Sequence, residues 1–131
     1  MGGIVLAGGI PSKIYILFYD IEISFFGLAA PEFVVSPPST IDISENQVLK
    51  VSFQVTGNPQ PKGQSYWTHL KVPSDYDTVE FGLLGFSGSF VSDSLGSSYC
   101  GRTLKTRAIN NAGKTDYIET KISMICKYYR L

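Results

Sequence analysis

Few side chains in this sequence could carry acid–base chemistry. The chain has one histidine, His69, and histidine is the side chain that titrates most readily near neutral pH. A hydrolase triad would pair His69 with an acid such as Asp93 and with a serine, but no nucleophile-elbow pattern surrounds any serine. We therefore expect His69 to lie at the edge of the core or on the surface, and we do not expect an enzyme.

Metal and phosphate sites are not indicated either. Asp75 and Asp77 lack the further oxygen ligands of a calcium loop and are typical of a solvated turn. The glycine-rich segments 7–9 and 85–88 do not stand between a strand and a helix, as a phosphate loop requires. No Asn-x-Ser/Thr acceptor for N-glycosylation occurs. The sequence thus predicts no cofactor and no metal ion.

Composition favours one β-rich domain. A chain of 131 residues with 44% hydrophobic residues can build one core. Its 13 glycines, 7 prolines and many β-branched and aromatic residues favour short strands and turns over helices. Because 11 basic and 11 acidic residues cancel, nucleic acid and anionic membranes are not expected partners.

Residues 1–30 differ from the rest of the chain, because they are mostly apolar and aromatic. They are read either as a secretory signal cut after Ala29 or as an extension that adds a strand or tail, since acidic residues interrupt the apolar run. The uninterrupted run is too short for a transmembrane helix of about twenty residues. We expect residues 31–126 to form the domain and residues 127–131 a tail, without a membrane span.

From residue 31 onward, short alternating runs end in turn residues about every ten positions. The clearest run places Phe53 and its apolar neighbours at every second position, on one face. This pattern predicts an all-β antiparallel sandwich of two sheets. The expected strands cover residues 33–35, 41–43, 49–56, 65–72, 79–84, 89–91, 104–109 and 114–124.

Three local patterns resemble the immunoglobulin superfamily, and its I-set in particular, over about residues 31–125. Gly57-x-Pro59-x-Pro61 resembles the family's B–C loop, and Trp67 stands at the position of the core tryptophan of strand C. Ala108-x-Asn110-x-x-Gly113 resembles the end of strand F and the F–G turn. The resemblance implies a Greek-key immunoglobulin-like sandwich.

The same alignment shows departures from the family. Phe53 and Thr106 occupy the two positions of the usual disulfide between strands B and F, and Leu104 replaces the tyrosine of the corner hydrogen bond. We expect Phe53, Thr106 and Trp67 to face inward and to fill the space of the missing cystine. A contact between Trp67 and Phe53 would favour an immunoglobulin domain over a fibronectin type III domain.

The chain's two cysteines, Cys100 and Cys126, lie just before strand F and just after strand G. A hairpin that turns at residues 111–112 places position 100 opposite about position 123, so the cysteines are about three residues out of register. Two alternatives follow. One is a disulfide that closes the base of the hairpin, which would point to an oxidising compartment; the other is a pair of free thiols.

Strand alternation also predicts a recognition face on the solvent side of strands C, F and G. Aromatic anchors with charged neighbours are typical of protein interfaces. The face comprises Tyr66, Thr68, Lys105, Arg107, Tyr117, Glu119 and Lys121. The alternative is an ordinary solvated face.

We therefore interpret the chain as an extracellular or cell-surface module for cell adhesion and recognition, which binds another protein. The resemblance extends to receptors of the cnidarian allorecognition type, which implies homophilic self/non-self binding. Two alternatives stay open. One is an intracellular I-set module of a cytoskeletal or muscle protein, which predicts reduced cysteines; the other is a fibronectin type III domain.

Overall fold

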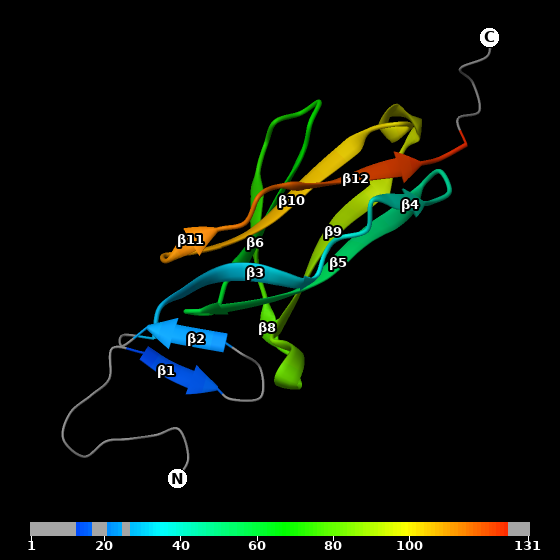
Figure 1. The fold of residues 1–131 in the computed structure, drawn as a ribbon. Coiled ribbons are helices and arrows are strands. Elements are labelled where there is room, and N and C mark those ends of the chain that lie inside the picture. Colours follow the sequence, from blue (N-terminus) through cyan, green and yellow to red (C-terminus); the bar gives the residue numbers. More distant parts are fainter. Residues whose placement is uncertain (1–12, 17–20, 25–26, 126–131) are drawn as a thin grey trace, which may run out of the picture.

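The computed structural model describes residues 13–16, 21–24 and 27–125. Two sheets pack face to face as a sandwich (Figure 1), which confirms the predicted all-β architecture. The first sheet holds, in order, β3 (Ala29–Val35), β5 (Gln47–Asn58), β9 (Phe86–Leu95) and β8 (Val79–Glu80). The second holds β4 (Thr40–Asp42), β12 (Ile118–Ser123), β10 (Thr103–Asn110), β6 (Lys62–Trp67) and β7 (Ser74–Asp77), with β11 (Gly113–Lys114) paired to β10. Two short 3-10 turns flank β9: η1 (Gly82–Leu84) and η2 (Ser97–Tyr99).

A separate two-stranded antiparallel sheet lies in the N-terminal segment and consists of β1 (Lys13–Ile16) and β2 (Ile21–Ser24). β3 begins at Ala29, inside the segment that the sequence set apart. The predicted tail at residues 127–131 lies outside the described residues. The choice between a signal and an extension stays a prediction.

The chain changes sheets between β3 and β4. β3 pairs antiparallel with β5, whereas β4 pairs in parallel with β12. Pro37 and Pro38 stand between them, and proline has no N–H to continue a strand ladder. Thr120 Oγ1 donates to the carbonyl of Pro38 at 2.6 Å, and Lys121 N donates to that of Ser39 at 2.9 Å. These bonds attach the crossing segment to β12.

Four predictions of strands and turns need correction. The predicted strand 114–124 is divided into β11 and β12, because residues 115–117 belong to neither strand. The predicted strand 65–72 is β6, which ends at Trp67 because a hydrogen-bonded turn follows. The predicted strand 79–84 is the short β8 followed by η1. Residues 74–77, which read as a turn, form β7, because pairing with β6 overrides the turn preference of their aspartates.

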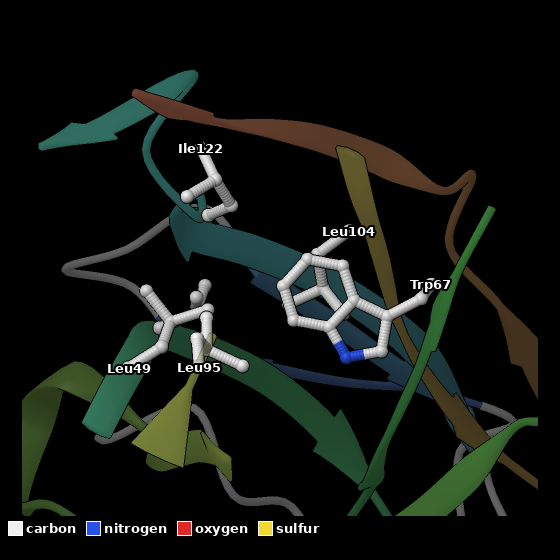
Figure 2. Close-up of a cluster of buried hydrophobic side chains, with 6 residues drawn as sticks. Leu49, Trp67, Leu95, Leu104 and Ile122 are labelled. Atoms are coloured by element: carbon white, nitrogen blue, oxygen red, sulfur yellow. The ribbon is translucent and has the colours of Figure 1, made fainter. Parts of the chain in front are cut away.

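The core falls into two clusters of buried side chains. In the first, Trp67 and Leu104 from one sheet face Leu49 and Leu95 from the other, with Ile122 beside them (Figure 2). The inward residues of β5 alternate with exposed ones, as the sequence predicted. Each large apolar side chain buried in this way contributes about 1.5–3 kcal/mol.

The second cluster is built on Phe53, which is 1% exposed. Its ring meets Phe33 edge-on at 5.3 Å between centroids and lies 6.3 Å from the ring of Tyr76. Trp67 belongs to the first cluster, where its ring lies 4.8 Å from that of Tyr99. The expected packing of Trp67 against Phe53 is therefore corrected: each ring anchors its own cluster.

Two arrangements occupy the positions of the family's cystine. Phe53 pairs across the strands with Gly88, where an added Cβ would lie 2.5 Å from Phe53 Cζ, so the glycine makes room for the ring. Thr106 is fully buried, and its Oγ1 lies 2.9 Å from Ser65 Oγ in a hydrogen bond. Ser65 Oγ also hydrogen-bonds with the Tyr76 hydroxyl at 2.8 Å. Each arrangement lies within one sheet, and the rings of Phe53 and Tyr76, 6.3 Å apart, make the contact between the sheets where the family has its bridge.

Filling the space at Gly88 should destabilise the domain. We expect Gly88→Ala to cost about 1–3 kcal/mol, because overpacking displaces the ring of Phe53. Gly96→Ala is the matched control, since nothing lies within 4 Å of a Cβ at Gly96 and its φ is −80°. Urea unfolding measures both free energies. Equal midpoints for the two variants would show that the ring does not depend on this space.

The buried hydroxyl chain should give a stability that depends on alkaline pH. Burial raises the pKa of Tyr76 to about 12 from its ordinary 10.0, against the opposing effect of hydrogen bonds to Ser65 and Thr106. Between these values the folded chain holds a proton that the unfolded chain has lost, so stability falls as pH rises from about 10 to 12. Urea unfolding should show a steeper fall for the wild type than for Tyr76→Phe. Parallel pH profiles would contradict this role of the hydroxyl.

Candidate protein-binding face

Strand register assembles one outward face on the second sheet. Tyr66 of β6 lies opposite Lys105 of β10, which in turn lies opposite Glu119 of β12. The neighbours of Tyr66 along β6 are buried, so Tyr66 points outward. The same alternation turns Lys105 and Arg107 outward on β10.

Two tyrosines and an arginine form a cluster on this face. The rings of Tyr66 and Tyr117 meet edge to face, 5.1 Å between centroids. The guanidinium carbon of Arg107 lies 4.5 Å from the centre of the Tyr117 ring, within the range of cation–π attraction. Arg107 Nε donates to Gln64 Oε1 at 2.7 Å, which orients the guanidinium. Tyrosine and arginine are residue types that carry much of the binding energy in protein interfaces.

Beside this cluster the surface forms an open hollow of about 470 Å³. Its lining consists of Tyr66, Thr68, Lys71, Pro73, Lys105 and Tyr117. Lys105 also pairs with Glu119, whose Oε2 lies 3.7 Å from Nζ. The two side chains are 31% and 65% exposed, so this ion pair contributes about 1 kcal/mol at most and can be exchanged for another partner.

The structure brings most of the predicted face together. Tyr66, Thr68, Lys105 and Tyr117 line the hollow. Arg107 and Glu119 contact this group through the ring of Tyr117 and the side chain of Lys105. The remaining predicted residue, Lys121, lies opposite Thr103 and is not part of the lining.

Sequence reasoning missed Gln64, Lys71 and Pro73. Gln64 could have been found if β6 had been started at Lys62, because every second residue of the strand then points outward. Lys71 has a φ of 57°, a left-handed conformation that lysine rarely adopts. No local signal therefore indicates where the chain turns after β6 or that it returns Lys71 and Pro73 to this face.

Cys100 lies just before β10, and its Sγ is 3.6 Å from the carbonyl oxygen of Met124. The pairing of β10 with β12 places position 100 opposite Met124 rather than position 123, because a one-residue irregularity separates the β11 and β12 pairings. The described part of the chain contains no free cysteine. Cys126 lies outside the described residues, so its disulfide with Cys100 stays a prediction.

His69 lies in the turn after β6 rather than in the predicted strand. Its ring packs against those of Tyr99 at 5.3 Å and Trp67 at 6.1 Å, at the edge of the core. Partial burial, and then Arg102, lower the pKa of His69, which favours the neutral imidazole. Among the described residues no three acidic, histidine or cysteine side chains gather as metal ligands, and no helix there is long and apolar enough to cross a membrane.

The sandwich is similar to solved structures of titin and twitchin domains. A complex of titin and obscurin-like 1 immunoglobulin domains aligns with a TM-score of 0.55 and 14% identity, over 73% of this chain and 94% of that chain. An I-band fragment from titin gives a TM-score of 0.58 and 12% identity, over 74% of this chain and 33% of that one. The twitchin kinase region from C. elegans aligns with a TM-score of 0.56 and 15% identity, over 74% of this chain and 17% of that chain.

These likenesses show the fold, an immunoglobulin-like β-sandwich, as the sequence predicted. The chain spans a third or less of the longer titin and twitchin fragments. No protein-family model and no curated protein sequence matches this chain.

Proposed function

We propose that this chain is a protein-binding immunoglobulin-like module that docks a partner through the face of β6, β10 and β12. The cluster of Tyr66, Tyr117 and Arg107 beside the hollow carries this conclusion. Aromatic rings lose little conformational freedom on binding, and Arg107 is oriented before a partner arrives. The module works without catalysis and without a cofactor.

The parent protein in this proposal is intracellular and of the cytoskeletal or muscle kind, with an I-set module. Titin and twitchin supply similar structures, and one of them is itself a complex that contains an immunoglobulin domain. These neighbours favour an immunoglobulin over a fibronectin type III domain. The packing of Phe53 and the buried Thr106 also replace the intersheet disulfide by contacts that need no oxidising compartment.

A cell-surface recognition module, with homophilic binding, is the second candidate. The position of Cys100 favours it, because its sulfur lies beside the carbonyl of Met124, just before Cys126 in the sequence. A disulfide there would close the base of the last hairpin and would require an oxidising compartment.

Removing both rings should strongly weaken partner binding. We expect Tyr66→Ala/Tyr117→Ala to lose about 30-fold or more in affinity, because buried tyrosine anchors contribute about 2 kcal/mol or more. The partner is identified by mass spectrometry after capture on the wild-type domain and is then produced in recombinant form. Surface plasmon resonance measures its affinity for each variant.

The matched control changes the outer face of the other sheet, where Lys50 and Val91 are exposed and lie opposite each other. Lys50→Thr/Val91→Thr should keep full affinity. Thermal melting by circular dichroism establishes that both double variants fold. Loss of binding in this control together with full binding by the tyrosine variant would place the docking surface on the opposite sheet and refute the proposal.

Intact mass after alkylation separates the two parent classes, with the protein taken from its native source. A cell-surface module is expected to carry the Cys100–Cys126 disulfide and to react with iodoacetamide only after reduction. Alkylation without reductant is the outcome expected of an intracellular parent. Reaction only after reduction would overturn the intracellular assignment and leave the protein-binding face unaffected.

A further inference from the structure

Charge around the hollow is unbalanced in a chain whose 11 basic and 11 acidic residues cancel. Lys71 and Lys105 line the hollow, and no acidic side chain does. Arg107 adds a third positive charge over the ring of Tyr117. The carboxylates nearest to this face are Glu119, which pairs with Lys105, Asp116, which precedes Tyr117 in the chain, and Asp75, which lies opposite Gln64; none of them lines the hollow. The hollow is therefore a local cationic site.

The turn after β6 holds Lys71 at this site. The backbone N–H groups of Leu70 and Lys71 both donate to the carbonyl of Trp67, at 3.0 and 2.8 Å. Lys71 takes a φ of 57°, which side chains with a Cβ rarely adopt. Unfavourable backbone conformations of this kind gather at functional positions. The turn accepts this conformation and places a cation beside the tyrosines.

The remaining lining determines the shape of a suitable ligand. Tyr66, Tyr117 and Pro73 present rings, and Thr68 adds a small polar side chain. A ligand that fills the hollow therefore needs a hydrocarbon stem along the rings and an anionic tip at the lysines. A glutamate side chain has this form, and its carboxylate makes charge-assisted hydrogen bonds with lysine.

We propose that the hollow takes an acidic segment of the partner protein, with carboxylates at Lys71 and Lys105 and their stems on Tyr66 and Tyr117. This inference rests on the proposed function and adds the chemistry of the partner to it. In the absence of a partner, Lys105 forms an exposed ion pair with Glu119, with 3.7 Å between Nζ and Oε2. A carboxylate of the partner can replace Glu119 in this ion pair. Opposite charges also speed the encounter, and added salt slows it.

The direct test uses a fluorescein-labelled Glu-Gly repeat peptide, with a Gln-Gly repeat peptide of equal length as the neutral probe. Fluorescence anisotropy at low ionic strength measures affinity, and amide NMR shifts locate the binding site. We expect the acidic peptide alone to bind, with an affinity that falls as salt is added. The shifts should centre on Tyr66, Lys71 and Lys105. Shifts centred on the other sheet would overturn the inference.

Single charge changes make the test specific. Lys71→Asn and Lys105→Gln should each weaken binding by about 2- to 5-fold, and asparagine is chosen because it tolerates the left-handed conformation. Glu119→Gln should strengthen binding by about 2- to 5-fold, because it releases Lys105. Lys50→Gln and Glu32→Gln make the same changes of net charge at exposed positions on the other sheet and should leave affinity unchanged.

Equal effects of Glu119→Gln and Glu32→Gln would show that net charge alone governs binding, and would overturn the inference. Tighter binding of a heparin fragment than of the acidic peptide would assign the hollow to a sulfated polysaccharide and overturn it as well. Loss of the captured partner in the tyrosine variant, without any binding of the acidic peptide, would leave the proposed function standing and refute the acidic segment. If the peptide binds at the hollow but the captured partner has the same affinity for the wild type and for the tyrosine variant, the proposed function is refuted instead.

Discussion

The ring of Phe53 joins the two sheets through its contact with Tyr76 of β7, at the position where the immunoglobulin domains that this sequence resembles have a covalent bridge. The ring needs more room than a cystine, and the structure takes that room from β9, where Gly88 has no side chain. Burial of such a ring contributes about 2 kcal/mol, comparable with the few kcal/mol of a disulfide. Packing of Phe53 thus replaces the cross-link, provided that position 88 of the neighbouring strand β9 has no Cβ.

Thr106 connects this core to the proposed docking face of β6, β10 and β12. Its hydroxyl bonds with Ser65 across the β6–β10 pair, while Lys105 and Arg107 on either side of it point outward. A slip of one residue in this pairing would expose Thr106 and bury the charged side chains. The buried hydroxyl chain and the charged face therefore favour the same register, so the polar core residues help to align Tyr66 with Lys105.

The predictable part of the structure is the part that rests on alternation along single strands. The inward side of the strand around Phe53 and the outward side around Lys105 follow from a period of two, and the structure has both. The wrong predictions concern features that depend on pairing between strands. Residues 74–77 have turn-forming side chains and were predicted as a turn, yet they form a strand because they pair with β6. Alternation also shows that Trp67 points inward without showing which inward residues it meets. The left-handed Lys71 has no signature in sequence at all.

In the proposed function, the face of β6, β10 and β12 contributes two kinds of binding group with different consequences. Arg107 is held by Gln64 and lies over Tyr117, so this part is rigid and suited to close packing, which governs how long a complex lasts. Lys105 forms an exposed ion pair with Glu119 that another carboxylate can replace. Its charge acts over a longer range than close packing does, and therefore governs the rate of association and the preference for a charged partner. Because the whole chain is neutral, no net charge adds to this local field. In this proposed function, a partner is therefore selected by charge at the hollow and retained by the rings beside it.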